Sequence, residues 1–266
     1  MESLTPTEFN LVYNFLSLAI AVMGAAFVFF VGARGNLAPH YRVSMIVSAV
    51  VVGVAGYHYF RIFQSWEAAY ALNEAGTAYL STGKPFNDAY RYADWLLTVP
   101  LLMVEAVAVL GLSKGVRGKM IAKLSIAAAA MIALGYPGEI ATENSTRMIW
   151  GTLSTIPFIY ILYVLWVELG KATKDESGEV KVLFRNLRLL LLATWGVYPI
   201  AFLFPVFGIE SAAALVGLQV GYSIADMTAK AGYGLMIYGI AKAKSEEEGY
   251  IREDAHAPAP KLAPAE

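Results

Sequence analysis

The chain has 266 residues, of which 58% are hydrophobic and 15% are charged, and its formal net charge is −1. Soluble domains carry about 25% charged residues. This composition and a mean hydropathy of +0.54 therefore exclude an ordinary soluble globule or enzyme, a disordered chain and a nucleic-acid-binding protein. The absence of cysteine and the presence of three histidines exclude disulfides, cysteine nucleophiles, cysteine-ligated metals and a histidine-rich metal site.

Seven mainly apolar stretches are each long enough to cross a membrane, which takes about 20 residues. They cover residues 8–31, 43–64, 89–112, 119–140, 146–170, 187–206 and 212–242. The first stretch lacks a basic leader and a small-residue cleavage site, so it is predicted to be a helix and not a signal peptide. We therefore predict an all-α fold, a bundle of seven transmembrane helices that forms one domain over residues 1–244.

Two segments lie outside these stretches. The connection at residues 65–88 contains two glycines and a proline around the β-prone residues 77–80, which predicts a small hairpin. The tail at residues 245–266 is charged and rich in alanine and proline, which predicts disorder.

Basic residues are distributed unevenly between the two sides of the predicted bundle. The loops after the first, third, fifth and seventh stretches carry most of them, whereas the other side carries Arg61, Lys84 and Arg147. Because cytoplasmic loops are rich in lysine and arginine, we predict an outside N-terminus and a cytoplasmic C-terminus. The two remaining basic residues, Arg91 and Lys230, lie within predicted spans, where ionisable residues are candidates for function.

Polar residues share one face of the third stretch. They are Arg91, Asp94, Thr98 and Glu105. At 100° per residue they fall in a stripe roughly 60° wide, and about 16 Å along the helix axis separates the two carboxyls. One interpretation is a structural polar seam between helices. We favour two proton-accepting stations at different depths, because carboxyls inside a membrane are costly without a task.

Aromatic residues of the third and sixth stretches are spaced to form one inward face. They are Trp95, Trp195, Tyr198 and Phe202, accompanied by Pro199. A helical aromatic stripe usually reflects core packing. The alternative is a cage of rigid rings around a long, flat, apolar ligand.

A charged pair lies in the middle of the seventh stretch. Asp226 and Lys230 are four residues apart and therefore share a helix face. A lysine at the bilayer centre costs roughly 2.5–3.5 kcal/mol on insertion scales. The pair is either a simple buried ion pair or the site of a Schiff base. In the second case a desolvated amine condenses with an aldehyde, and Asp94 and Asp226 balance the charge of the protonated imine.

Over nearly its whole length the sequence resembles the microbial rhodopsins. The resemblance rests on RYADWLLTVP at residues 91–100, WGVYP at 195–199 and DMTAK at 226–230. It implies all-trans retinal bound to Lys230 through a Schiff base, with Asp94 and Asp226 as the counterion complex. Residues matching retinal-pocket positions are Trp95, Leu102, Met131, Gly135, Ser154, Phe158, Trp195, Tyr198, Pro199 and Phe202.

Within this family, the residues of the third helix indicate the transported ion. Asp94, Thr98 and Glu105 resemble the pattern of the outward proton pumps of the proteorhodopsin and xanthorhodopsin groups. This implies that Asp94 is the primary proton acceptor and that Glu105 is the cytoplasmic donor. Related chloride pumps lack the first carboxylate and sodium pumps use an Asn-Asp-Gln pattern, so neither matches.

Side chains near the acceptor complete the implied proton path. His58 matches the second-helix histidine that pairs with the acceptor in these groups, which implies a hydrogen bond to Asp94. Without the resemblance, a satisfied core histidine is the alternative. Arg91 would steer the released proton outward, and Glu139 and Glu210 both remain candidates for the last exit group.

Gly151 departs from the bulky residue that is frequent at its position in the family. A glycine there would leave a side opening near the retinal ring, and xanthorhodopsin-like pumps use such an opening to seat a carotenoid antenna of the xanthophyll type. Further residues expected in this groove are Thr155, Asn186, Leu192 and Ile200, with Phe202 beside them. The alternative is a glycine that lets two helices pack closely.

The resemblance thus implies a light-driven outward proton pump, an ion transporter and not an enzyme. The expected location is a prokaryotic cell membrane, and the expected partners are the lipid bilayer, protons and further copies of the chain in a ring. One alternative is a sensory photoreceptor that signals through a partner, although such sensors usually lack a carboxyl where Glu105 stands. Another is a seven-helix carrier or channel without a chromophore.

Overall fold

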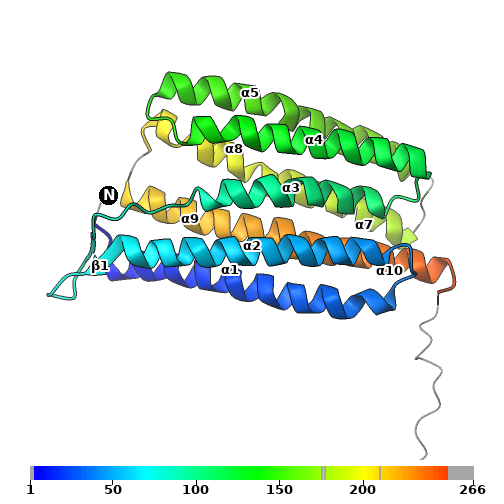
Figure 1. Cartoon of the computed structure of the whole chain (residues 1–266), viewed down its shortest axis with the longest axis horizontal. Coiled ribbons are helices and arrows are strands. Elements are labelled where there is room, and N and C mark those ends of the chain that lie inside the picture. The colour runs from blue at the N-terminus through cyan, green and yellow to red at the C-terminus, as the bar shows by residue number, and fades with distance from the viewer. Residues whose placement is uncertain (1–2, 175, 177, 210, 251–266) are drawn as a thin grey trace, which may run out of the picture.

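The structure is a computed structural model that describes residues 3–174, 176, 178–209 and 211–250. Within these residues, helical elements group into seven rods that lie side by side in an elongated bundle (Figure 1). The predicted all-α bundle is therefore confirmed. Four rods are single α-helices: α1 (Pro6–Ala33), α2 (Arg42–Ala69), α3 (Tyr90–Ala108) and α4 (Lys114–Glu139).

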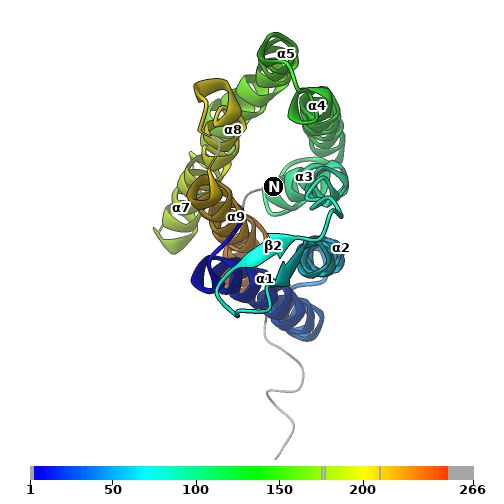
Figure 2. The same cartoon turned by 90° about the vertical axis from the view of Figure 1, so that its left-hand side faces the viewer.

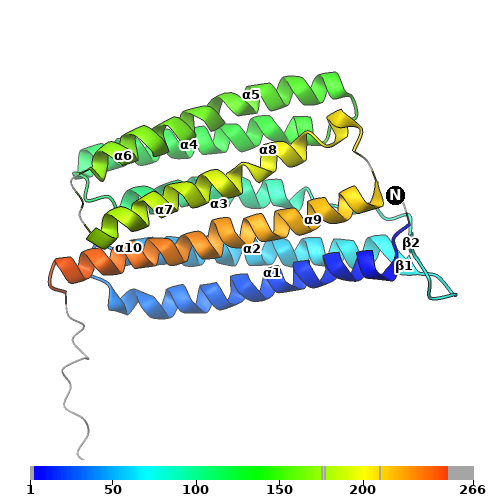
Figure 3. The same cartoon turned by 180° about the vertical axis from the view of Figure 1, so that it is seen from behind.

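The other three rods are composite and are best seen from behind (Figure 3). The fifth joins α5 (Asn144–Tyr163), the π-helical turn η2 (Val164–Glu168) and α6 (Leu169–Ala172). The sixth joins α7 (Gly178–Trp195) and α8 (Val197–Phe202). The seventh joins α9 (Ala212–Met227), the π-helical turn η4 (Thr228–Gly232) and α10 (Tyr233–Glu247). Short 3-10 turns, η1 (Arg34–Asn36) and η3 (Pro205–Phe207), follow α1 and α8.

Not every rod has the length and composition of a simple membrane span. Among the described residues, four helices meet both criteria: Pro6–Asn36, Arg42–Ala69, Lys114–Glu139 and Asn144–Glu168. The third rod fails because Arg91, Asp94 and Glu105 lie within its 19 residues. The seventh rod carries the charged pair Asp226 and Lys230 in its middle. These charged residues are positions that the sequence had singled out, whereas the π-helical turn at Lys230 is visible only in the structure.

The predicted hairpin is confirmed between α2 and α3. Strands β1 (Tyr70–Leu72) and β2 (Tyr79–Ser81) pair antiparallel, and the hairpin lies across the ends of α1 and α2 (Figure 2). Leu4 pairs with Tyr79 through two backbone hydrogen bonds of 3.0 and 2.8 Å. The Tyr79 ring also stacks on Phe9 at a centroid distance of 3.8 Å. The hairpin therefore covers the end of the bundle at which the first helix begins.

The C-terminal boundary of the bundle differs from the prediction. Instead of disorder from residue 245, α10 continues to Glu247, and residues 248–250 pack against the turn between α1 and α2. The Ala38 amide donates a 3.0 Å hydrogen bond to Ser245 Oγ, and the Tyr41 hydroxyl donates a 2.7 Å hydrogen bond to Glu248. Burial and the nearby Glu248 raise the pKa of Tyr41, so it remains a donor at neutral pH. These long-range contacts are invisible to composition, and the rest of the predicted tail, residues 251–266, lies outside the described residues.

The sixth helix also begins earlier than predicted, at Gly178 and not at residue 187. Its first turns carry charged residues on one side, but Val180, Phe184 and Leu187 are buried on the other. Hydropathy detects only the fully apolar part of such a helix, whereas an amphipathic end is stabilised by packing one face on the bundle.

Close helix contacts bring the seventh rod against the first. At Gly234 an added Cβ would lie 2.5 Å from the Phe30 ring, so a side chain there would collide with it. The absence of a side chain lets α10 approach α1 at the level just past η4. This packing holds the π-helical turn, and the lysine within it, inside the bundle.

Candidate functional site

The centre of the site is Lys230 in the π-helical turn η4. Its side chain is 2% exposed, and its Nζ lies 2.5 Å from Asp226 Oδ1 and 3.0 Å from Asp94 Oδ2. Asp226 comes from the preceding turn of the same rod, whereas Asp94 comes from α3. The structure thus brings together three of the charged residues singled out in the sequence. Two buried carboxyls face one buried amine.

The two carboxyls have different surroundings. Asp226 accepts hydrogen bonds from the hydroxyls of Tyr59 and Tyr198, each at 2.7 Å, and from Trp95 Nε1 at 3.2 Å. Asp94 Oδ1 is buried and accepts no hydrogen bond from a described residue. Three donors therefore hold Asp226 in one orientation, while Asp94 retains an unused acceptor oxygen beside the amine.

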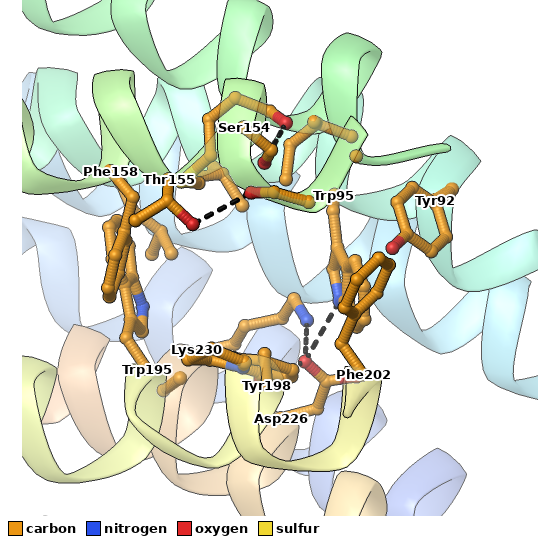
Figure 4. Close-up of a pocket in the computed structure, with 18 residues that line it drawn as sticks. Tyr92, Trp95, Ser154, Thr155, Phe158, Trp195, Tyr198, Phe202, Asp226 and Lys230 are labelled. Carbon is orange, nitrogen blue, oxygen red and sulfur yellow. Dashed lines mark hydrogen bonds and ion pairs between the residues drawn. The ribbon is translucent and has the colours of Figure 1, made fainter. Parts of the chain in front are cut away.

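A cavity extends from Lys230 between the third, fourth, fifth and sixth rods (Figure 4). The space between atoms in and around it is roughly 850 Å³, part of which is open to the outside. Trp195 and Phe158 lie together at one end, and Tyr92 and Phe202 lie at the other (Figure 4). The remaining wall residues are Trp95, Val99, Leu102, Met131, Ile132, Gly135, Gly151, Ser154, Thr155, Tyr198, Pro199, Asp226 and Ala229.

The wall of this cavity includes all ten residues that the resemblance assigned to a cofactor pocket. Tyr92, Val99, Ile132 and Ala229 also line it and were missed by sequence reasoning. So was Tyr59, which donates to Asp226 from α2. Apolar and aromatic residues are abundant in every rod, so no sequence signal separates these wall residues from those that face lipid.

The groove expected at Gly151 is only partly present. Gly151 and Thr155 line the cavity, but the Phe202 ring fills the space beside the glycine: an added Cβ would lie 2.6 Å from it. The predicted open notch is therefore occupied by a side chain of the sixth rod. Leu192 and Ile200 lie on the outer surface of that rod, with Ile200 63% exposed, and Asn186 is half-buried. None of these three lines the cavity.

The predicted hydrogen bond between His58 and Asp94 is not formed among the described residues. Nδ1 of His58 lies 3.0 Å from the Val54 carbonyl oxygen, one turn earlier in α2. His58 is still close enough to Asp94 to interact with it electrostatically. A carbonyl oxygen of its own helix is the partner of the ring, which agrees with the alternative of a satisfied histidine.

Glu105 lies deeper in the bundle and on the other side of Lys230 from the hairpin. Its side chain is 0% exposed, and Oε2 accepts a 3.0 Å hydrogen bond from Ser48. Its neighbours Met103, Ala106 and Val107 are fully buried as well. Thr98, between the two carboxyls along α3, donates to the Asp94 carbonyl oxygen at 2.9 Å. The third helix therefore carries two buried carboxyls in separate compartments.

The hairpin side of Asp94 holds the remaining predicted residues. Arg91 is 2% exposed, and its Nη1 lies 3.5 Å from Oδ2 of Asp88, a residue that sequence reasoning missed. Glu139 forms a 3.6 Å ion pair with Arg147. Glu210, the other predicted exit candidate, lies outside the described residues.

Comparisons with known proteins agree with this geometry. The family of bacteriorhodopsin-like proteins matches residues 10–243. Green-light absorbing proteorhodopsin from a gamma-proteobacterium is 29% identical over 230 residues, which cover 86% of this chain and 85% of that protein. The structure of xanthorhodopsin, a light-driven ion pump with dual chromophore, matches with a TM-score of 0.91 and 58% identity over 94% of this chain and 100% of that one. A thermophilic rhodopsin matches with a TM-score of 0.90 and 52% identity over 94% and 100% of the two chains.

The extent of these matches excludes a coincidental likeness of short motifs. The family match spans all seven rods, from within α1 to within α10. Its members in prokaryotes are multi-pass membrane proteins, in keeping with the apolar helices of this chain. The protein is therefore a multi-pass membrane protein of the bacteriorhodopsin-like family, a microbial rhodopsin.

Proposed function

We propose that this chain is a light-driven outward proton pump that binds all-trans retinal through Lys230. One observation carries the proposal: Lys230 Nζ lies in the wall of a mainly apolar cavity, 3.0 Å from one carboxylate and 2.5 Å from another. The likeness to proteorhodopsin and to xanthorhodopsin, a light-driven ion pump, supports it.

The residues around Lys230 fit this chromophore. The cavity is long and apolar, with the rings of Trp195 and Phe158 at one end, and only a few polar groups gather at the lysine. Two carboxylates beside one amine would stabilise a positive charge on its nitrogen while that nitrogen is protonated. When bound, retinal supplies the absorption of visible light and an isomerisation that turns the N–H bond at Lys230.

Asp94 is the acceptor for the proton that leaves Lys230 Nζ. Its Oδ2 is within direct proton-transfer distance, and its Oδ1 is free to accept a hydrogen bond. Asp226 is even closer, but two tyrosines and Trp95 already donate to it. These donors stabilise the ionised form of Asp226, so it acts as a counterion while Asp94 takes the proton.

Glu105 returns a proton to Lys230 from the opposite side. A charge at this fully buried position is costly, so Glu105 holds its proton until Lys230 has lost one. The distribution of basic loops supports an outside N-terminus, which puts the start of α3 and Asp94 toward the outside. Net outward transport follows when Asp94 releases its proton to the outside and Glu105 takes up a new proton from the cytoplasm.

Illumination of cells that express the chain tests this function. With added retinal we expect the medium to acidify in the light, and a protonophore should abolish the signal. Cells without retinal are the control. A coloured protein that leaves the external pH unchanged and has a photocycle of seconds would contradict the pump and favour the sensory alternative.

Substitution of Glu105 by glutamine is expected to slow the return of the proton to Lys230 by roughly 100-fold, because a positioned acid contributes about 10²–10⁴-fold. The rise of absorbance as the protonated state re-forms after a laser flash measures this step. Glu246→Gln is the matched control, because it removes a carboxylate on the predicted cytoplasmic side whose side chain is 65% exposed. An unaltered recovery in Glu105→Gln would exclude Glu105 as the donor.

We also propose a carotenoid of the xanthophyll type as an antenna at the Gly151 side of the cavity. Gly151 and Thr155 line the cavity, and the Phe202 ring beside Gly151 offers a flat apolar surface for a polyene ring. Ile200 and Leu192 extend this surface outward along the sixth rod, where both are exposed. The dual chromophore of xanthorhodopsin, which is 58% identical, supports a second pigment.

Insertion of a bulky side chain at this position is expected to remove the antenna. In Gly151→Trp we expect the carotenoid bands to disappear from the excitation spectrum of pumping, with retinal absorption and direct pumping retained. Ile156→Trp introduces the same side chain at an exposed site of α5, where Ile156 is 63% exposed, and should leave the spectrum unchanged. If the native protein gains no excitation band when given carotenoid, the antenna proposal is wrong.

A further inference from the structure

A cluster of buried polar groups lies between Asp94 and the hairpin end of the bundle. Gln219 of α9 is fully buried and donates a 3.0 Å hydrogen bond from Nε2 to Asp88 Oδ2. The same carboxylate oxygen lies 3.5 Å from Arg91 Nη1. Asp88 thus links α9 to the start of α3, one turn before Arg91 and two turns before Asp94.

Several polar atoms of this cluster have no partner among the described residues. They are Nε and Nη2 of Arg91 and Oε1 of Gln219, all buried. Buried polar atoms in native proteins are nearly always hydrogen-bonded, to protein groups or to ordered water. These three atoms are therefore the positions at which water molecules would be held, and they lie on the outward side of Asp94.

Arg91 connects this cluster to the lysine site. Its guanidinium lies 4.9 Å from the Tyr222 ring centroid and 5.7 Å from that of Tyr59, whose hydroxyl donates to Asp226. Asp88 and Asp226 both interact with it electrostatically. A change of charge at the lysine site therefore changes the electrostatic potential at Arg91, which pairs with Asp88.

Asp88 is better suited than Glu139 to release a proton to the outside. Its side chain is 35% exposed, so one carboxylate contacts buried groups and is also accessible from outside the bundle. Glu139 is less exposed, and Arg147 holds it both through the 3.6 Å ion pair and through a 2.9 Å hydrogen bond to its backbone carbonyl.

We propose that Asp88 is the exit carboxylate of the outward path, an inference that rests on the proposed pump function. The proton bound to the Asp94 carboxyl leaves it, passes through water held at Arg91 and binds Asp88. Asp94 becomes ionised again, and Asp88 then gives the proton to external water and recovers its charge. Gln219 is a positioning residue that orients the Asp88 carboxylate toward Arg91.

Proton release after a flash, followed with a pH-sensitive dye, tests this assignment. In Asp88→Asn we expect release to be delayed by about tenfold or more, with unchanged proton loss from Lys230, because removal of one positioned acid or base costs at least that much. Asp88→Glu should restore release to nearly the native time. Glu74→Gln, which removes an exposed carboxylate in the hairpin at the same end, is the matched control.

Two outcomes would overturn the assignment. One is native release timing in Asp88→Asn; the other is a delay in Glu139→Gln that Asp88→Asn does not show. Failure of the pump proposal is distinct, because the native protein would then not acidify the medium at all. The role of Gln219 is tested by infrared difference spectra. The carboxyl band that disappears in Asp88→Asn should be shifted in Gln219→Leu relative to the native protein. An unshifted band would exclude the positioning role.

Discussion

Asp94→Asn is expected to abolish light-driven proton transport, with acidification reduced by about 100-fold or more, as for loss of a positioned base. The carboxylate lies 3.0 Å from Lys230 Nζ, so the substitution removes both the acceptor and one of two negative charges beside the nitrogen. Loss of a counterion stabilises the excited state, in which positive charge moves away from the nitrogen, so absorption should shift to longer wavelength. External pH under illumination and the visible spectrum measure the two effects.

The control for this variant is a substitution that removes a different carboxylate at the same end of the bundle. Glu143, which precedes α5, is exposed and takes no part in the lysine site, so Glu143→Gln should pump and absorb like the native protein. Unchanged acidification in Asp94→Asn would refute the acceptor role. A shift to shorter wavelength would contradict the counterion role even if pumping were lost.

Lys230→Ala is expected to prevent formation of any visible pigment, because the only amine that faces the cavity among the residues lining it is removed. Purified protein incubated with all-trans retinal should show an absorption band in the native form and none in the variant. We expect complete loss of the visible band and not a partial decrease, since the variant has no amine with which to form the covalent bond.

The matched control is the other buried, paired lysine of the described chain. Lys244 forms an ion pair with Glu176 and lies over the Phe184 ring, far along α10 from the cavity. Lys244→Ala should keep the visible band. A native protein that stays colourless with retinal, or a coloured Lys230→Ala, would refute the chromophore site and with it the proposed function.

The elements of the fold were predictable where a pattern is local. Apolar length located the seven rods, and glycines around a β-prone run located the hairpin between Tyr70 and Ser81. Helical spacing also put Asp226 and Lys230 on one face, as the structure has them. The sixth helix begins at Gly178, before the expected start, and the seventh rod continues a few residues past 244, because packing stabilises both ends.

Helix rotation and packing decided what the spacing left open. The sequence by itself determined that a lysine and three carboxyls are buried in two helices, since the spacing of charges in an apolar run requires it. Only the tertiary structure decided that Tyr59 donates to Asp226, that His58 faces Val54 and that Phe202 fills the space at Gly151. These contacts depend on how far each helix is rotated and shifted relative to its neighbours, and on which of several nearby partners a side chain binds. The spacing of residues within one helix determines neither of these.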